Sequence, residues 1–472
     1  MKILLIQPPK APLTLGGEDV FIYEPLALEY LAAALAPHHD VRILDMRLDH
    51  GLPQALQSFQ PDIVGLTAYT VHVNVVRRLC EQIKTWNPQV LTVVGGHHAT
   101  VMPEDFLSPT IDLVVIGEGV FTFRDVVERF EKRERFDSVA GIAFAKGNGI
   151  CLTEPRPMPE LDSFPLPARQ LTAAYRAHYY SEWMKPLASM RTSKGCPFRC
   201  NFCALWKLTA GRYLRRSPEK VVEELATISE PYVFFADDES LVDAARMKSL
   251  AELIHAAGIR KRFFLYGRSD TIARHPDLLE LWRSIGLERV FVGFEFFRDE
   301  DLAFIRKGST AADNEKAARI LTDLGIEVYA SFIVRPEFKR QDFAAFPPYC
   351  RKLGLRFATF AVLTPLPGTD FYAEVKDRLI TGNYDLFDFI HTLLPTALPM
   401  EQFYEELCVL YQRAVPLHKQ LPMFAKFPLL DIPPLLAKNR RILKRMRTLH
   451  RDYDSPEGRH DKLMASSGAD RF

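Results

Sequence analysis

Three cysteines with the spacing C-x3-C-x2-C lie close together in this chain: Cys196, Cys200 and Cys203. They follow a strand-like apolar run and precede a helix that we expect to begin at Pro218, after the capping residue Ser217. Three thiolates on one short loop can bind three irons of a [4Fe-4S] cube, which ordinarily takes four cysteines. The fourth iron then has no ligand from this motif, so a small molecule can bind it. The motif predicts an iron–sulfur enzyme.

Zinc and disulfide interpretations fit the cysteines less well. A structural zinc site needs four nitrogen or sulfur ligands, usually as two pairs. No second pair exists, because the remaining cysteines stand alone in the sequence: Cys80, Cys151, Cys350 and Cys408. Those at 80 and 408 fall in helix-like apolar segments, which indicates buried, inert thiols. Seven cysteines in a long chain without a secretion signal do not favour a disulfide framework.

The cysteine motif, with the aromatic Phe202 before its last cysteine, resembles that of the radical SAM superfamily. The resemblance implies that S-adenosylmethionine chelates the open iron through its amino and carboxylate groups. It also implies that an electron from the cluster cleaves the sulfonium and releases a 5′-deoxyadenosyl radical, with Phe202 beside the adenine. The three cysteines are then both the metal ligands and the catalytic residues, and a flavodoxin- or ferredoxin-type reductant is the expected electron donor.

Composition excludes several other classes. The 472 residues leave room for two or three domains, and 47% apolar with 25% charged residues is ordinary for a globular protein. A formal net charge of +1 gives no general attraction to nucleic acid, so no nucleic-acid partner is expected. No apolar run reaches the roughly 18 residues of a membrane span, and the short apolar N-terminus predicts a buried strand. Because a reducible cluster needs a reducing compartment, we expect a cytoplasmic protein.

Short apolar runs alternate with helical stretches in the first part of the chain. Each run is apolar on both faces, as in parallel strands covered by helices on both sides. The expected strands are Ile3–Ile6, Val41–Leu44, Ile63–Thr67, Leu91–Val94 and Leu113–Ile116. We therefore predict a doubly wound α/β domain over residues 1–138, with ligands beyond the carboxyl ends of the strands.

Unusual residues follow the last three of these strands, in Thr67-Ala-Tyr-Thr, Gly95-Gly-His-His and Gly117-Glu-Gly. Adjacent glycines allow backbone to approach a ligand closely. A G-x-G-x-x-G fingerprint is missing after the first strand, so nicotinamide and flavin binding are disfavoured.

Thr67 followed by the Gly95-Gly96 pair resembles the cobalamin-binding Rossmann domain that precedes many radical SAM modules. The resemblance implies bound cobalamin and a set of contacting residues. These are Thr67, Tyr69, His72, Gly95, Gly96, His97 and Glu118. The loop after the first strand lacks the D-x-H-x-x-G histidine that coordinates cobalt in other cobalamin enzymes, so we expect no histidine lower ligand, with Tyr69 and His72 near that face. A surface or helix-capping role is the alternative for His72 and His97.

Residues 139–186 predict a hairpin, Gly141–Thr153, and then a proline-rich extended linker. From 187 to 370, β–α alternation occurs six times, which predicts a partial barrel with its chemistry at the carboxyl ends of the strands. The expected strands are Ala188–Thr192, Tyr232–Ala236, Phe263–Gly267, Val290–Phe294, Val328–Val334 and Phe357–Leu363.

Charged residues stand at the ends of these strands. By strand order, the radical SAM resemblance implies that Asp237 and Asp238 contact the methionine amino group of S-adenosylmethionine. It implies that Arg268 and Glu295 contact its carboxylate or ribose. The usual Gly-Gly-Glu is replaced here by an acidic run, and the segment Thr364–Thr369 resembles one common in the cobalamin-linked branch.

Residues 371–472 predict a mostly helical C-terminal region. Its aromatic part, from Asn383 to Leu407, resembles that of hopanoid C-3 methylases and, less closely, bacteriochlorophyll side-chain methylases, which implies that it closes the barrel around the substrate. Lys438–Arg451 holds seven Lys/Arg and no acid. A basic amphipathic helix of this kind can lie peripherally on anionic lipid, and a solvated helix is the alternative. From Glu457 onward we expect disorder.

Together these features predict a cobalamin-dependent radical SAM C-methyltransferase that acts on an unactivated carbon of a hydrophobic small molecule or lipid. A hopanoid is the first candidate substrate and a tetrapyrrole the second. The alternatives are a cobalamin-dependent radical SAM enzyme that cyclises or rearranges its substrate without methyl transfer, and a non-catalytic cobalamin or iron–sulfur sensor. Methylthiolation is disfavoured, because the first domain has no second cysteine triplet.

The replacement Cys200→Ala should abolish the visible absorption of the cluster and all formation of 5′-deoxyadenosine, because three thiolates must hold three irons. Anaerobic reconstitution followed by absorption spectroscopy and product analysis measures both. The matched variant Cys408→Ala should keep both. Full iron content and cleavage in Cys200→Ala would contradict the assignment.

Overall fold

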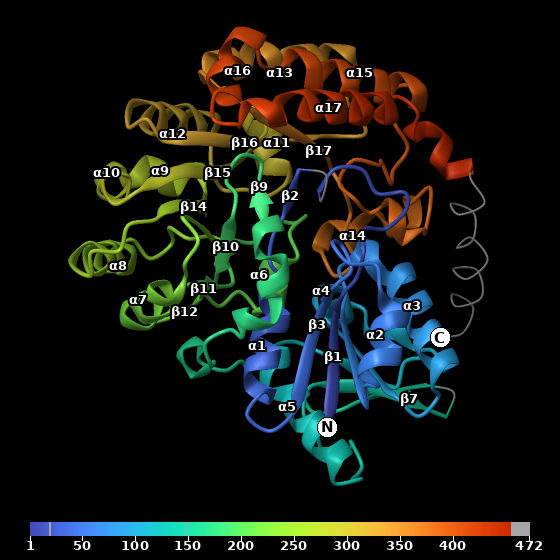
Figure 1. Cartoon of the computed structure of the whole chain (residues 1–472). Helices are drawn as coiled ribbons and strands as arrows, with labels where there is room; N and C mark the ends of the chain where they lie inside the picture. The colour runs from blue at the N-terminus through green and yellow to red at the C-terminus, as the bar shows by residue number, and fades with distance from the viewer. Residues whose placement is uncertain (18–19, 148, 455–472) are drawn as a thin grey trace.

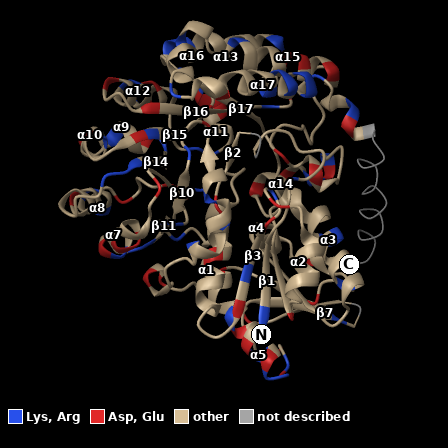
Figure 2. Cartoon of the chain, in the orientation of Figure 1, with Lys and Arg blue, Asp and Glu red and all other residues tan. Residues whose placement is uncertain are grey.

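Two parallel sheets and an outer helical layer form the chain (Figure 1). The computed structural model describes residues 1–17, 20–147 and 149–454, so the segment expected to be disordered from Glu457 lies outside the described residues. Lys and Arg are interspersed with Asp and Glu along the drawn ribbon (Figure 2), in keeping with the net charge of +1.

The first sheet has seven strands in the order β3-β1-β4-β5-β6-β7-β8. All five expected strands are present and pair in parallel. Their bounds are β1 Lys2–Gln7, β3 Asp40–Asp45, β4 Ile63–Thr67, β5 Leu91–Gly95 and β6 Leu113–Val115. The predicted hairpin also forms, as β7 (Ile142–Lys146) and β8 (Gly149–Leu152). We expected it in the linker, but β7 pairs antiparallel with β6 and so extends the first sheet.

Helices cover both faces of this sheet. Successive residues of a strand point to opposite faces, and because both sets are apolar, both faces need to be covered. Leu4 and Ile6 of β1 pack in one core, and Ile3 and Leu5 pack in a second core on the other face. The covering helices are α2 (Leu52–Phe59) and α3 (Val73–Trp86) on the first of these faces, and α1 (Leu26–Leu35) and α5 (Gly119–Glu131) on the second. The expected doubly wound α/β architecture is confirmed.

The second sheet holds six parallel strands in sequence order, which gives the expected partial barrel. Its strands are β10 Leu187–Met190, β13 Tyr232–Phe235, β14 Arg262–Gly267, β15 Leu287–Glu295, β16 Glu327–Val334 and β17 Ala358–Val362. The connecting helices include α7 Pro218–Thr227, α8 Ala244–Ala256, α9 Ser269–Arg274, α10 Pro276–Ser284, α11 Asp299–Phe304, α12 Ala311–Asp323 and α13 Arg340–Lys352. Outward rings such as Phe235 and Phe263 pack under these helices, whereas Phe234 and Phe264 face the other way.

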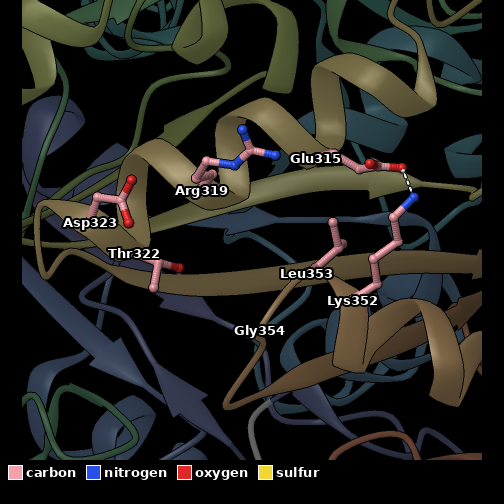
Figure 3. Close-up of a pocket in the computed structure, with 7 residues that line it drawn as sticks. All are labelled: Glu315, Arg319, Thr322, Asp323, Lys352, Leu353 and Gly354. Carbon is pink, nitrogen blue, oxygen red and sulfur yellow. Dashed lines mark hydrogen bonds and ion pairs between the residues drawn. The ribbon is translucent and has the colours of Figure 1, made fainter.

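A surface hollow of about 250 Å³ lies between α12 and the end of α13 (Figure 3). Its lining is mostly charged, with Glu315 paired to Lys352 at 2.6 Å. None of the residues expected to bind a cofactor lines it. The hollow therefore belongs to the outer face of the barrel.

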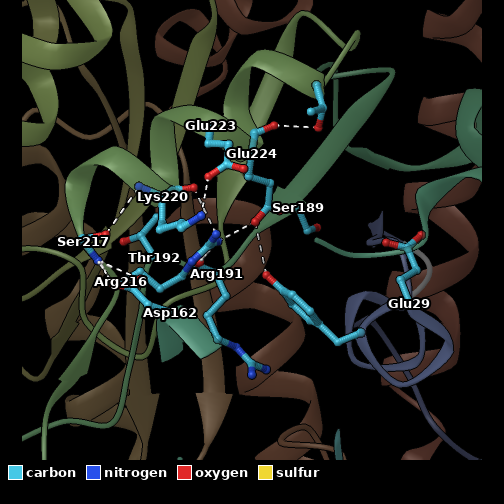
Figure 4. A network of polar contacts seen from close by, with 12 residues as sticks. Glu29, Asp162, Ser189, Arg191, Thr192, Arg216, Ser217, Lys220, Glu223 and Glu224 are labelled. Atoms are coloured by element: carbon cyan, nitrogen blue, oxygen red, sulfur yellow. Dashed lines mark hydrogen bonds and ion pairs between the residues drawn. The ribbon is translucent and has the colours of Figure 1, made fainter. Parts of the chain in front are cut away.

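A buried ionic network joins the two sheets through the linker. Arg169, in the 3-10 segment η5 (Arg169–His178), pairs with Glu24 and, at 2.7 Å, with Glu224 of α7. Glu224 also pairs with Arg216 and accepts a hydrogen bond from Tyr30 of α1 at 3.3 Å (Figure 4). Charges buried in this way are costly unless each is paired, so the network favours one relative placement of the two halves.

The C-terminal region is helical, as expected, in α15 (Met400–Arg413), α16 (Leu417–Phe424) and α17 (Ile432–Met446), which lie at the top of Figure 1. The basic helix predicted over 438–451 therefore begins and ends earlier than expected, and a 3-10 segment, η9 (Leu449–Asp454), follows it. Among the described residues, none of the helices has both the length and the hydropathy needed to cross a membrane.

His391 joins two parts of the C-terminal region, one of which contacts the N-terminal part of the chain. Its Nδ1 and Nε2 lie 3.0 and 2.9 Å from carboxylate oxygens of Asp388 and Asp452, so both ring nitrogens are placed to donate. Asp388 also accepts from the backbone N–H of Leu15 at 2.9 Å. Burial alone would lower the pKa of His391, but the attraction of Asp388 and the hydrogen bonds with both carboxylates raise it to about 9.

Stability should therefore fall between pH 6.5 and 9. A base whose pKa is raised on folding contributes stability that is complete below its unfolded pKa of about 6.5 and is lost as the pH rises through its folded pKa. The shift corresponds to at most about 3 kcal/mol. Thermal unfolding midpoints measured across this range should decline for the native chain and much less for His391→Gln. An equal slope in the two proteins would contradict the charged clamp.

Candidate functional site

The carboxyl ends of the two sheets face each other across one ion pair. Lys194 precedes the cysteine loop, and its Nζ lies 2.5 Å from a carboxylate oxygen of Glu118, which follows β6 of the first sheet. Arg191, after β10 of the second sheet, lies 3.6 Å from the same carboxylate. The residues predicted to bind two different cofactors are thus brought to a common region.

Buried carboxylates fix the backbone that leads into the cysteine loop. Asp237 accepts hydrogen bonds from the N–H and hydroxyl of Thr192 at 2.7 and 2.6 Å and from the N–H of Ser193 at 2.8 Å. Asp238 accepts from the N–H of Gly195 at 2.6 Å. Both oxygens of Asp237 thus hold the backbone that enters the loop. The predicted contact of Asp237 and Asp238 with the methionine amino group stays a prediction.

Gly195 is needed at the start of this loop. Its φ is +89°, and a Cβ there would lie 2.1 Å from the carbonyl oxygen of Arg212. The loop runs from β11 (Ser193–Lys194) to α6 (Leu205–Leu208), and β11 pairs with β12 (Leu214–Arg215), so the close approach is part of a small hairpin.

The three thiols of the loop lie near one another. Cys200 is buried and Cys196 and Cys203 are half-buried. Burial raises the pKa of Cys196 to about 11 and that of Cys203 to about 12, and each feels the charge of Cys200. A [4Fe-4S] cube places each thiolate on a different iron, and three thiols on one short loop fit that donor set.

Glu239 belongs to the acidic run after β13, but the sequence analysis assigned it no role of its own. It is buried beside Cys196, and its Oε1 accepts from the N–H of Arg268 at 3.1 Å. No hydrogen-bond donor among the described residues reaches its Oε2, and burial raises the pKa of this carboxyl to about 7. Buried hydroxyls of nearby segments also lack partners within the described residues: Ser240, Ser269 and Ser309. Unpaired buried polar atoms beside the thiols fit a ligand with ammonium and hydroxyl groups.

Arg268 lies beside the cluster loop, and both Arg268 and Glu295 contact protein groups. Their predicted contact with S-adenosylmethionine stays a prediction. The guanidinium of Arg268 lies 3.9 Å from the Sγ of Cys200, donates to the carbonyl of Lys307 at 2.5 Å, and stacks 3.7 Å from the ring centre of Phe198. Glu295 pairs with Lys307 at 2.7 Å. Its φ of +60° is strained for a residue with a side chain, which fits a position held for function.

Phe202 is half-buried and packs against the main apolar core of the second sheet. A ring in this position keeps part of its surface accessible. Its predicted contact with adenine stays a prediction.

On the first sheet, the predicted cobalamin residues occupy adjacent strand ends. Thr67 ends β4, and Tyr69 stands beside the 3-10 turn η2 (Thr70–His72), while His97 begins α4 (His97–Val101). The side chain of Tyr69 is 57% exposed, yet burial raises its pKa, so it borders a space that protein surrounds. Its ring lies 5.5 Å from that of His97, whose pKa burial lowers to about 4.

His72 is turned inward. It is 6% exposed, its Nδ1 accepts from the N–H of Tyr69 at 3.4 Å, and burial lowers its pKa to about 4. The neutral ring caps its own turn, which matches the capping alternative for this residue.

The two adjacent glycines differ from each other. A Cβ on Gly96, whose φ is +105°, would lie 2.7 Å from the Oγ1 of Thr67 and 2.8 Å from the N of Ala68. A Cβ on Gly95 would meet Val115 at an ordinary 3.5 Å. The close approach at Gly96 is thus to the protein's own backbone. Gly117 has a φ of +81°, and a Cβ there would meet no described atom within 4 Å, so this position is open.

A buried cluster of His98, Asp105 and Tyr384 was also missed. His98 bridges Asp105 at 2.8 Å and the Oγ1 of Thr70 at 3.1 Å. Asp105 also accepts from the hydroxyl of Tyr384 at 2.6 Å. The C-terminal segment predicted to close the barrel therefore also packs on the cofactor-facing edge of the first sheet. No spacing in the sequence links residues so far apart.

Comparison with known proteins agrees that the two sheets belong to two different domains. Residues 13–127 match the family model of the B12 binding domain, and residues 190–346 match that of the radical SAM superfamily. The chain is 32% identical over 425 residues to the hopanoid C-3 methylase of Methylococcus capsulatus, a match that covers 88% of this chain and 81% of that protein. It is 27% identical to the anaerobic magnesium-protoporphyrin IX monomethyl ester cyclase of Rubrivivax gelatinosus, over 84% of this chain and 75% of that one.

Among solved structures, the fold is similar to that of the cobalamin-dependent S-adenosylmethionine radical enzyme OxsB with aqua-cobalamin and S-adenosylmethionine bound. The TM-score is 0.71 at 16% identity, and the match covers 99% of this chain and 74% of that one. Both sheets and the helical layer therefore occur together in a known fold.

The variants Gly96→Ala and Gly95→Ala should differ sharply. The first forces a side chain into a positive-φ position against the backbone of Ala68, at a cost of about 1–3 kcal/mol, and should lower both the unfolding midpoint and cobalamin affinity. The second should leave both nearly unchanged. Thermal unfolding and cobalamin titration of the two proteins measure this, and equal effects would contradict the separate roles.

Proposed function

We propose that this chain, which belongs to the family of cobalamin-dependent radical SAM methyltransferases, transfers a methyl group to an unactivated carbon of a hydrophobic, hopanoid-like lipid. Enzymes of this family use cobalamin, a [4Fe-4S] cluster and S-adenosylmethionine. The substrate class is supported by the 32% identity to a hopanoid C-3 methylase and by the rings that face the site.

The bound cofactors supply a radical that removes hydrogen from the substrate carbon and a methyl group for that carbon to accept. In this proposal Cys196, Cys200 and Cys203 hold the cluster, and Asp237 and Asp238 fix the loop that carries them. A flavodoxin- or ferredoxin-type protein would supply the electron.

Glu239 is the group we assign to the ammonium of S-adenosylmethionine, because its Oε2 is a buried acceptor without a partner in the described structure. The backbone N–H of Arg268 donates to the Glu239 carboxylate at 3.1 Å, and the guanidinium of Arg268 stacks on Phe198. The strand-end residues Thr67, Tyr69 and His97, with the open position at Gly117, are the proposed surface for cobalamin.

The observation that carries the substrate class is a row of aromatic rings on the inner face of the second sheet. Neighbouring ring centres lie 5.1 Å apart for Phe234 and Tyr266, 4.9 Å for Tyr266 and Phe291, and 5.2 Å for Phe291 and Tyr329. Burial and the nearby Tyr69 raise the pKa of Tyr266, so the row reaches the cofactor-facing edge of the first sheet. Rings of this kind favour a large apolar substrate and exclude water from a radical.

A second candidate is cyclisation of a tetrapyrrole without methyl transfer. The observation that favours it is the 27% identity to magnesium-protoporphyrin IX monomethyl ester cyclases over most of the chain. Both reactions begin with removal of a hydrogen atom, so formation of 5′-deoxyadenosine does not distinguish them.

Labelled S-adenosylmethionine separates the candidates. Reconstituted protein, dithionite, S-adenosylmethionine with a deuterated methyl group and a hopanoid in detergent should give a product that carries the label, detected by mass spectrometry. A parallel reaction contains magnesium protoporphyrin monomethyl ester. The Cys200→Ala protein serves as the blank for both.

Label in the hopanoid supports the proposal. If the tetrapyrrole is cyclised without gaining label and the hopanoid gains none, the result contradicts the proposed methyl transfer and supports the second candidate. Absence of 5′-deoxyadenosine in a protein that holds its cluster and cobalamin would favour a sensor and contradict both.

A further inference from the structure

Large apolar side chains gather on the outside of the C-terminal helical layer. Five of the eleven exposed large hydrophobic residues of the described chain lie between 417 and 436. They are Leu417 at 67% exposure, Leu421 at 57%, Leu429 at 83%, Leu430 at 89% and Leu436 at 46%. Single exposed leucines are ordinary, but a concentrated group of them marks a surface that contacts something apolar. We refer to these five residues as the leucine patch.

The charge around the leucine patch is strongly positive. Residues 416–451 contain nine Lys/Arg and one acid, Asp431, in a chain whose net charge is only +1. No carboxylate among the described residues pairs with Arg440, Arg441 or Lys444, which are all exposed on α17 (blue in Figure 2). We refer to these three residues as the basic face.

Leu436, a member of the leucine patch, shares one side of α17 with the basic face. Leu436, Arg440 and Lys444 are spaced by four residues, so they line one stripe of α17. The other side of this helix is buried: Met446 is 2% exposed, and the carbonyl of Leu443 accepts from the thiol of Cys408 on α15. The helix therefore turns Leu436 and the basic face away from the protein.

Strong contacts hold the leucine patch in place. Between α16 and the 3-10 turn η8 (Leu429–Asp431), Lys426 pairs with Glu327 at 2.7 Å and lies 4.4 Å from the ring centre of Trp183. Phe427 packs edge-on against Trp183 at 5.9 Å. Phe427 and Met423 also join the aromatic cluster on the inner face of the second sheet. The exposed leucines are thus presented by an anchored segment next to the proposed substrate region.

We propose that the leucine patch and the basic face together bind the surface of a lipid bilayer that contains anionic headgroups. The leucines enter the boundary of the acyl chains, and the cations contact the phosphates. A nucleic acid would match the cations but would leave the leucines in water, and an apolar protein partner would match the leucines but not the cations. This inference does not rest on the proposed reaction, because vesicle binding is measured without substrate or turnover.

The test is sedimentation of the full-length, cofactor-loaded chain with vesicles. One set is phosphatidylcholine alone, and the other is phosphatidylcholine mixed with phosphatidylglycerol. The chain should bind the anionic vesicles at least about tenfold more tightly, and added salt should weaken the binding. The variant Leu429→Ser/Leu430→Ser/Leu436→Ser and the variant Arg440→Glu/Arg441→Glu/Lys444→Glu should each lose about tenfold or more in binding.

Matched controls carry the same changes elsewhere on the surface. Leu152→Ser/Leu166→Ser replaces exposed leucines outside the patch, and Lys132→Glu/Arg135→Glu/Lys146→Glu replaces exposed cations of the first domain. Both controls should bind vesicles like the native chain. Cluster and cobalamin content reports folding, and the charge variant tests the proposal if the leucine variant fails to fold.

Three outcomes would overturn the proposal. The native chain could fail to bind either vesicle, or the charge and leucine variants could bind as well as the controls. A concentration-dependent dimer in sedimentation velocity that the leucine variant abolishes, without vesicle binding, would assign the patch to a second copy of the chain.

Discussion

The hydrogen bonds from the backbone of residues 192–195 to Asp237 and Asp238 are the interaction on which the site depends. A loop with three cysteines has many conformations of its own, and a cluster needs the three thiols on one side of it. Two carboxylates at the end of β13 remove most of that freedom, because each accepts from backbone N–H groups just before Cys196. The same strand end then carries Glu239, which lies beside Cys196 and keeps one oxygen without a partner in the described residues.

A second requirement is that the two sheets keep one relative placement. Their strand ends meet at the Lys194–Glu118 ion pair. The buried network around Arg169 and Glu224 adds to this, since removing one partner would leave an uncompensated charge in the interior. It ties α1 of the first sheet and α7 of the second to the linker. This arrangement suits chemistry in which two cofactors on separate domains must reach one substrate.

The C-terminal region serves two surfaces at once. Its inner side is locked by the charged His391 clamp, which reaches the N-terminal loop at Leu15, and by Tyr384, which reaches the cofactor-facing edge at Asp105. Its outer side exposes cations and a group of leucines, and a group of exposed leucines is unfavourable in water without an apolar counterpart. The proposed bilayer contact and the proposed lipid substrate are separate inferences, but the ring cluster that Phe427 joins lies between the two surfaces.

The sequence alone determined the order of the strands, the three cysteines and the strand ends that carry polar residues, since these follow from local periodicity, spacing and the chemistry of the side chains. It also placed the helical C-terminal region. Tertiary structure decided which of those polar residues form hydrogen bonds within the protein itself. Asp237 is engaged by the loop and His72 by its own turn, while Glu239, beside the expected pair, keeps an acceptor unpaired within the described chain. Gly96 is required by the backbone of Ala68, and His98 meets Tyr384 from a distant segment. Apart from the local turn of His72, these assignments depend on contacts between parts of the chain that are far apart in sequence, and no local pattern records those contacts.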